Sequence, residues 1–251
     1  MSDASGRRIV LVHGAAHGAW CWERVVPALE ARGFLIDAPD LPGLGADDTP
    51  PAQVTFEAYV RRVLEAIRAR PGPVLLVGHS MGGGPISQAA EDAAGQVRQL
   101  LYLTAALPVN GEGLGALTQM TARFPGRSAG TALRPGPLPG TMEFAVEMAA
   151  AAFYNQCDPA TAAMAVGRLR PQAVGPLQGT PLTLTPGRWG RIPKTYVVCT
   201  ADQALPPDLQ RWLCSRVPGI RIVERAWDHS PFLSDPAGLV DLLAAQALDP
   251  P

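Results

Sequence analysis

The segment PVLLVGHSMGGGPISQAA carries a serine in the pattern Gly78-x-Ser80-x-Gly82. The residues before it are typical of a buried strand and those after it of a helix. This pattern indicates a nucleophilic serine when it lies between a strand and a helix. At such a sharp turn the neighbouring positions have no room for a side chain, which explains both glycines. The serine hydroxyl then projects from the sheet edge beside the positive end of a helix. We predict that Ser80 is a nucleophile for acyl transfer; a chance glycine-rich helix start is the weaker alternative.

A serine nucleophile needs a base to accept its proton, and the chain has only four histidines. His13 and His17 lie in the loop after the first predicted strand. His79 lies inside the serine turn, where its side chain is expected to point away from the open face of the nucleophile. His229 follows the last predicted strand in AWDHSPFLSDP, from where it can reach the edge at which the serine emerges. We predict that His229 is the base, in preference to a helix cap or a surface residue.

The base in turn needs a carboxylate that orients its ring and stabilises its protonated form. Asp202 comes soon after the predicted strand 194–199, the strand that precedes the one leading to His229. Asp228 and Asp235 are the alternatives. Asp228 adjoins the histidine and would strain to reach its ring, and Asp235 is expected to begin the final helix. We predict Asp202 as the acid, which gives the chain order Ser, Asp, His.

Acyl transfer also needs two N–H donors at the place where the carbonyl oxygen becomes negative. One is predicted to be the N–H of Met81, the residue after the nucleophile. The other is predicted to be the N–H of Ala15, in the loop after the first strand, where Gly14 lets the backbone turn. The alternative for HGAAHGAW is a plain glycine-rich connector, which is weaker because the serine needs a partner loop here.

Apolar, β-rich runs alternate with amphipathic stretches along most of the chain. The predicted strands are 8–12, 34–37, 74–77, 97–103, 194–199 and 220–224, and the predicted helices are 22–31, 56–69, 83–94, 206–216 and 237–247. Because most of the strands are apolar throughout, they are expected to be buried on both faces of a parallel sheet. The alternation predicts an α/β fold with a doubly wound, mostly parallel sheet of about six strands.

The alternation stops once, between residues 108 and 192, where no strand signal occurs. A structureless loop of this length is not expected in a compact domain. We predict a helical insertion over one edge of the sheet, with helices at 141–154 and 159–169 and a Pro/Gly loop at 134–140. Residues 1–107 and 193–251 then form the core, and residues 108–192 form a cap.

Composition excludes several classes of protein. The 251 residues are 47% hydrophobic and 17% charged with a net charge of −1, which is typical of a globular protein and does not suggest a nucleic-acid or anionic-membrane partner. The four cysteines show no CxxC spacing, so no metal site and no redox disulfide is expected. The N-terminal apolar run is too short for a signal peptide or a membrane span, so we expect a cytoplasmic protein.

Several segments together resemble the α/β-hydrolases, and more narrowly the group of plant methylesterases, the salicylate-binding methyl esterase and the hydroxynitrile lyases. These segments, which run from residue 8 to residue 236, are VLVHGAAHGAWCWERVVPALEARGF, GHSMGG, AAFYNQCDP, CTADQALPPDLQRW and WDHSPFLSDP. GHSMGG is common to many hydrolases, whereas HGAAHGAWCW and AAFYN are much more specific. The resemblance implies an α/β-hydrolase fold, with a six-stranded parallel sheet under a cap, an apolar acyl pocket and no cofactor.

The resemblance also separates ester hydrolysis from cyanohydrin cleavage. The similar lyases carry Thr directly after the first-strand His and Lys directly after the catalytic His, and both groups help to bind the cyanohydrin and stabilise cyanide. This chain has Gly14 and Ser230 at those positions. A small, neutral pair cannot steady a departing anion in that way, so lyase activity is disfavoured.

The predicted function is therefore a serine carboxylesterase for a small apolar or aromatic ester, with a methyl ester as the leading candidate by resemblance. Gly14, Trp20, Phe153 and Tyr154 are the candidate substrate contacts, with packing as the alternative role of Trp20. Two other functions stay open: non-ester chemistry with the same triad, such as hydroxynitrile lyase-like reaction, C–C cleavage or cyclisation, and a catalytically silent small-ligand-binding protein. A homodimer also stays open.

Overall fold

The computed structural model describes residues 7–121, 123–124, 133–178 and 181–248 of the chain. At its centre is a parallel sheet with the strand order β2-β1-β3-β4-β8-β9. Its strands are β1 (Arg8–Val12), β2 (Leu35–Asp37), β3 (Val74–His79), β4 (Val97–Leu103), β8 (Lys194–Cys199) and β9 (Arg221–Arg225). The six predicted strands are confirmed. Every residue of β1, β3 and β8 is buried, as expected of apolar strands inside a parallel sheet.

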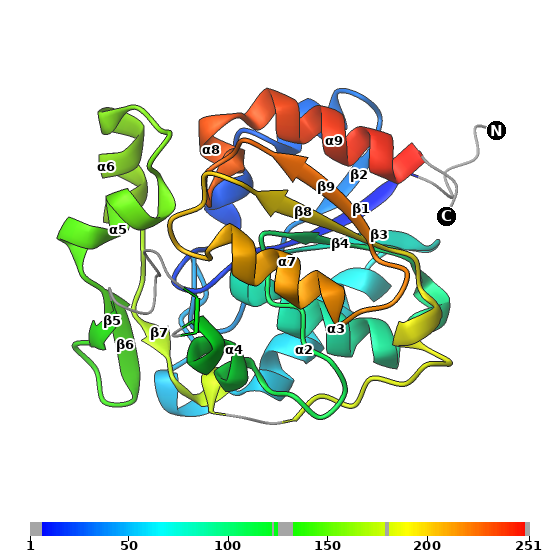
Figure 1. Cartoon of the computed structure of the whole chain (residues 1–251), viewed down its shortest axis with the longest axis horizontal. Coiled ribbons are helices and arrows are strands. Elements are labelled where there is room, and N and C mark those ends of the chain that lie inside the picture. Colours follow the sequence, from blue (N-terminus) through cyan, green and yellow to red (C-terminus); the bar gives the residue numbers. More distant parts are fainter. Residues whose placement is uncertain (1–6, 122, 125–132, 179–180, 249–251) are drawn as a thin grey trace.

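Helices cover both faces of this sheet, so the doubly wound arrangement is confirmed. The helices outside residues 108–192 are α1 (Val26–Glu30), α2 (Phe56–Arg68), α3 (Gly83–Asp92), α7 (Pro207–Ser215), α8 (Pro231–Ser234) and α9 (Pro236–Leu248). On one face, Val10 and Val12 of β1 belong to a hydrophobic cluster with residues of α2, α3 and α7. On the other, Ile9 and Leu11 belong to a cluster with residues of α1 and α9. Figure 1 shows α2, α3 and α7 on one side of the sheet and α9 on the other.

Local sequence explains where two of these helices begin. The Thr55 hydroxyl accepts the Ala58 N–H (3.1 Å) and so caps α2. The predicted helix 22–31 is wrong at its start, because residues 19–22 form a separate 3-10 turn and α1 begins only at Val26. Pro27 lacks an N–H and fits best in the first turn of a helix, which explains the late start. The 3-10 turns among the described residues are Ala19–Trp22, Pro51–Gln53, Ser80–Gly82, Ala94–Gln96, Gly175–Leu177 and Trp189–Arg191.

Residues 108–192 differ from the prediction because they contain strands as well as helices. The elements are α4 (Leu114–Thr121), α5 (Val146–Phe153), α6 (Pro159–Gly167) and an antiparallel sheet of β5 (Leu133–Pro135), β6 (Thr141–Phe144) and β7 (Gln172–Ala173). The expectation of no strand is therefore wrong, and the predicted helix 141–154 begins only at Val146. Residues 141–144 pair instead with β5 and β7, and Arg134 of β5 donates to Glu143 of β6 (2.9 Å). This strand pairing overrides the local helical pattern.

Part of this segment lies at one end of the molecule, whereas α4 lies nearer to α7 (Figure 1). Figure 1 shows α5, α6 and β5–β7 beyond the carboxyl ends of β8 and β9. The division into a core and a cap stays a prediction, and residues 1–6, 122, 125–132, 179–180 and 249–251 of those two parts lie outside the described residues. Among the helices that the structure describes, none combines the length and the apolar character needed to cross a membrane.

Candidate active site

Ser80 lies at the sharp turn between β3 and α3. Its φ is 51°, in the left-handed region that non-glycine residues rarely adopt. The close approach of the backbone explains both glycines of the motif. A Cβ on Gly82 would lie 2.7 Å from the carbonyl oxygen of His13, and one on Gly78 would lie 2.9 Å from that of Gly82. The turn geometry inferred from the sequence is therefore present, and the backbone strain of about 1–3 kcal/mol is typical of functional sites.

His229 and Asp202 form a buried pair beside this turn. His229 Nδ1 lies 2.7 Å from Asp202 Oδ2, and both side chains are almost completely buried. The carboxylate is held by four further groups: its Oδ1 accepts the N–H of Ala204 (2.7 Å) and Leu205 (2.8 Å), and its Oδ2 accepts the hydroxyl of Thr104 (2.5 Å) and the amide of Gln210 (3.4 Å). Because a carboxylate accepts the proton on Nδ1, the unprotonated nitrogen of the neutral ring is Nε2.

The two alternative acids have other partners. Asp228 accepts N–H bonds from Gln156 (3.1 Å) and Ser230 (3.0 Å), and burial raises the pKa of its carboxyl above the usual range. Asp235 accepts the N–H of Gly238 (3.0 Å) in the first turn of α9, as the sequence predicts for a helix start. Neither carboxylate contacts the His229 ring within the part of the chain that the structure describes. The geometry therefore favours Asp202 as its partner.

Three loops meet at Ser80. A Cβ on Gly14, in the loop after β1, would lie 2.8 Å from Ser80 Cβ and 3.0 Å from His79 Nδ1. His79 Nε2–H donates to the carbonyl of His229 (2.8 Å), and the two rings lie 4.7 Å apart. Burial lowers the pKa of His79 well below its usual value, so this ring is neutral. The β1 loop, the serine turn and the histidine loop therefore converge, and His79 has a structural partner of its own.

The loop after β1 holds its peptide groups in fixed directions. His13 Nδ1–H donates to the Gly14 carbonyl (2.8 Å), and His13 Nε2 accepts the N–H of Leu41 (3.0 Å). Farther along, Ala16 has a φ of 60° and donates its N–H to Gln172 Oε1 (3.2 Å). His13 is therefore occupied at both nitrogens, which agrees with its exclusion as the base.

Two N–H groups remain available around Ser80. No acceptor for the Ala15 N–H occurs among the hydrogen bonds of the described residues, although the carbonyl groups on both sides of it are bonded. Met81 is the second residue of the Ser80–Gly82 turn, and N–H groups in the first turn of a helix lack an intrahelical acceptor. The predicted pair of donors thus belongs to the two backbone segments that meet at Ser80.

The predicted substrate contacts differ in their surroundings. The Phe153 ring lies 5.4 Å from the His229 ring and 4.7 Å from the Phe144 ring, so it borders the histidine directly. The Tyr154 hydroxyl lies 2.8 Å from His17 Nε2, and the Trp20 ring stacks on the His17 ring at 5.4 Å. Both Tyr154 and Trp20 are buried. Phe153 is buried as well, and of the three aromatic residues it is the one whose ring borders His229.

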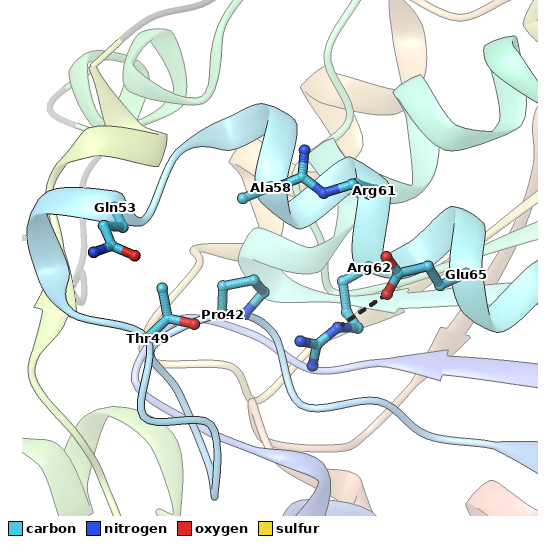
Figure 2. A pocket seen from close by; sticks show the side chains of 7 residues that line it. All are labelled: Pro42, Thr49, Gln53, Ala58, Arg61, Arg62 and Glu65. Atoms are coloured by element: carbon cyan, nitrogen blue, oxygen red, sulfur yellow. Dashed lines mark ion pairs between the residues drawn. The ribbon is translucent and has the colours of Figure 1, made fainter.

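A polar depression on α2 lies apart from these residues. Figure 2 shows its lining: Pro42, Thr49, Gln53, Ala58, Arg61, Arg62 and Glu65. Arg62 donates to the carbonyl of Asp40 (2.6 Å) and to the carboxylate of Asp47 (3.0 Å), and it forms an ion pair with Glu65 (3.4 Å). These contacts occupy the guanidinium of Arg62. We therefore interpret the depression as a place where α2 packs against the preceding loop.

A model of the alpha/beta hydrolase family matches residues 9–242. The chain belongs to this family. Several proteins similar to this α/β hydrolase are named for an activity. Esterase PIR7B of Oryza sativa subsp. japonica is 32% identical, with 97% of this chain and 96% of that protein covered. Methylesterase 7 of Arabidopsis thaliana is 31% identical, with 97% of both covered. The resemblance to the methylesterase group is thereby confirmed.

Solved structures agree with this assignment. A pyrethroid hydrolase from Sphingobium faniae JZ-2 superposes on this α/β hydrolase with a TM-score of 0.84 at 30% identity, with 97% of this chain and 98% of that chain covered. The fold class predicted from the sequence is therefore confirmed. The predicted enzyme class, a carboxylic ester hydrolase, agrees with the esterase and methylesterase names of the relatives.

Three side chains of this α/β hydrolase contact Asp202 or the loop after β1 and are not predicted from the sequence; one is Gln210, which donates to Asp202 (3.4 Å). Thr104 contacts Asp202, and Gln172 contacts Ala16. Thr104 directly follows β4, the strand beside β3, so a polar residue at that strand end is a signal that the sequence does contain. Gln172 belongs to β7, a strand that the sequence does not predict, and nothing in its local pattern points to the site.

Proposed function

We propose that this α/β hydrolase is a carboxylesterase in which Ser80 attacks the ester carbonyl, His229 accepts its proton and Asp202 orients the histidine. The observation that carries the proposal is the buried 2.7 Å contact between His229 Nδ1 and Asp202 Oδ2, next to a serine with a φ of 51°. The esterase names of the relatives support the same class of reaction.

The first half of the proposed cycle forms an acyl-enzyme. Ser80 Oγ bonds to the carbonyl carbon while its proton passes to His229 Nε2, and the carbonyl oxygen becomes an oxyanion. The N–H groups of Ala15 and Met81 donate to this oxyanion. The C–O bond to the leaving group then breaks, and His229 gives its proton to the departing alcohol.

The second half returns the enzyme to its starting state. A water molecule attacks the acyl carbon and gives a proton to His229, which passes it to Ser80 Oγ as the acyl–serine bond breaks. Asp202 stabilises the protonated histidine in both halves. Its carboxylate suits this role because it also accepts hydrogen bonds from Thr104, Ala204, Leu205 and Gln210.

The proposed substrate is a small apolar or aromatic carboxylic ester, with a methyl ester first. The aromatic ring of Phe153 beside His229, with Phe144 packed against it, supports an apolar acyl group. The name of the Arabidopsis relative supports the methyl ester. The small, neutral residues Gly14 and Ser230 leave no cation to stabilise a departing cyanide, which supports ester hydrolysis over a lyase reaction.

A turnover screen tests this function. Wild-type protein, Ser80→Ala and the exposed-serine control Ser215→Ala are assayed with methyl, acetyl and thioester substrates. We expect turnover of a methyl ester by the wild type and the control, and a loss of at least about 10³-fold in Ser80→Ala. Strong cyanohydrin cleavage with weak ester turnover, or ester turnover that survives in Ser80→Ala, contradicts the proposal.

The proposal also covers the location of the enzyme in the cell and its partners. All four cysteines are free thiols, which supports a location in the reducing cytoplasm. The proposed partner is a small-molecule ester, and neither nucleic acid nor membrane is part of the proposed function. A homodimer stays a prediction that sedimentation velocity can test.

A further inference from the structure

His17 uses both of its ring nitrogens inside the protein. Nδ1 lies 2.8 Å from the Ala15 carbonyl oxygen, and Nε2 lies 2.8 Å from the Tyr154 hydroxyl. A carbonyl can only accept, so Nδ1 carries the proton and Nε2 accepts the hydroxyl proton of Tyr154. His17 is 1% exposed, and burial lowers its pKa to about 3. The ring therefore keeps this neutral tautomer throughout the neutral pH range.

The plane of the His17 ring is fixed as well. Trp20 stacks on it with an interplanar angle of 15°, and the guanidinium of Arg168 lies 4.7 Å from the Trp20 ring centre. Glu23 holds Arg168 through two contacts of 2.7 Å each. Phe153 packs edge-on against His17 at 5.7 Å. The imidazole is thus held by two hydrogen bonds and by rings on its face and edge.

These contacts determine the direction of the Ala15 N–H. That N–H belongs to the peptide group whose carbonyl is on Gly14 and is bonded to His13. The next peptide group has its carbonyl on Ala15, which is bonded to His17, and its N–H on Ala16, which is bonded to Gln172. Holding both peptide planes that flank the Ala15 Cα fixes the backbone dihedrals of Ala15.

We infer that His17 and Tyr154 are positioning residues of the oxyanion hole. Tyr154 orients His17, His17 holds the Ala15 carbonyl, and the Ala15 N–H is thereby directed at the oxyanion. The inference rests on the proposed function, because it concerns the same site. It links the residue that follows α5 to the loop after β1, which are more than a hundred positions apart in the sequence.

A purely structural role of His17 and Tyr154 is the alternative, and it predicts different effects of substitution on stability and kinetics. Loss of a buried hydrogen bond lowers the stability of the folded protein wherever the bond lies. Loss of a positioning contact also weakens the binding of the tetrahedral transition state while the binding of the planar ester changes little. Removal of a whole oxyanion donor costs about 10²–10³ in kcat, so a misaligned donor should cost a fraction of that.

The test compares Tyr154→Phe with Tyr102→Phe, which removes an equally buried hydroxyl of β4 that bonds to other partners. Tyr102 is bonded to Ser87 (2.8 Å) and Trp189 (3.0 Å) and does not contact the β1 loop. We measure Tm, kcat and KM with p-nitrophenyl acetate, and the inhibition constant of phenylboronic acid, which forms a tetrahedral adduct with a nucleophilic serine. We expect Tyr154→Phe to lower kcat about 10-fold and to weaken boronate inhibition about 10-fold, with KM within about twofold. Tyr102→Phe should change Tm alone.

Rescue at His17 is a second measurement. Asparagine places an amide N–H near the position of Nδ1, so His17→Asn should retain more kcat than His17→Leu. If Tyr154→Phe behaves like Tyr102→Phe, or if His17→Asn and His17→Leu lose equal activity, the positioning role is wrong while the esterase stands. If the wild type hydrolyses no ester and forms no boronate adduct, the proposed function fails and the inference falls with it.

Discussion

His79, the neighbour of the predicted nucleophile, donates its Nε2–H to the carbonyl oxygen of His229 at 2.8 Å. This bond joins the turn that carries Ser80 to the loop that carries the predicted base. Both groups are fully or almost fully buried. The relative positions of nucleophile and base are therefore set by a contact that takes no part in proton transfer.

Replacement of His79 by Leu should weaken both stability and catalysis. The variant leaves the His229 carbonyl without its donor in a buried place, which costs about 1–3 kcal/mol in the free energy of unfolding. Because the histidine loop loses its hydrogen bond to the serine turn, kcat should fall at least about 10-fold. Urea denaturation and ester turnover measure the two effects. Unchanged kcat in a destabilised variant would show that the bond has no role in alignment.

Asp202 and Asp228 should respond differently to the same substitution. Asp202→Asn removes the charge that stabilises protonated His229 and should lower kcat by about 10³–10⁴-fold. Asp228→Asn keeps an oxygen that can accept the Ser230 N–H, and it lies outside the predicted triad, so its kcat should fall less than about 10-fold. Steady-state kinetics of the two variants side by side decide between the acids. A larger loss in Asp228→Asn would reverse the assignment.

Three buried histidines should make the protein less stable in acid. Burial lowers the pKa of His13, His17 and His79, that of His17 from 6.5 to about 3. Below pH 6.5 the unfolded chain takes up protons that the folded chain does not, so the free energy of unfolding falls as the pH falls. Each histidine adds a slope of up to about 1.4 kcal/mol per pH unit. Asp228 has the opposite sign, because its raised pKa favours protonation in the folded state.

Urea denaturation at about pH 7, 6 and 5 measures this dependence. The wild type should lose stability at each step, and His17→Asn should lose less per step because one of the three histidines is gone. Equal slopes in the two proteins would contradict a neutral, buried His17.

Gly82 and Gly95 should differ in their tolerance of a methyl group. A Cβ at Gly82 would lie 2.7 Å from the backbone oxygen of His13 and 2.8 Å from that of Val12, so Gly82→Ala must displace the β1 loop. We expect a loss of about 1–3 kcal/mol in stability and a large loss of kcat. At Gly95 no atom lies within 4 Å, so Gly95→Ala should leave kcat unchanged and stability within about 1 kcal/mol. Similar kcat values for both variants would contradict the close packing of the turn.

The sequence predicts the parallel sheet and the serine turn well because both depend on local patterns. Apolar runs identify the strands, and the two glycines identify the turn before and after Ser80. Only four histidines occur, so elimination leads to His229, and strand order leads to Asp202. The structure brings these two side chains to 2.7 Å.

The remaining features depend on contacts between distant residues, which local patterns do not register. β6 forms where a helix is predicted because β5 and β7 pair with it. Tyr154 and Trp20 are predicted as substrate contacts from their types and positions, yet both contact His17. From the sequence alone, His17 is considered only as a candidate base and is ruled out in that role. Its two hydrogen bonds become visible only when residues 15, 17 and 154 are seen together.

Covalent labelling tests the nucleophilic role of Ser80 most directly. The wild type and Ser80→Ala are treated with a fluorophosphonate, and the labelled residue is located by peptide mass mapping. We predict one adduct per chain, on Ser80 in the wild type and absent from Ser80→Ala. An unlabelled wild type, or an adduct on another residue that persists in Ser80→Ala, would contradict a nucleophilic role of Ser80.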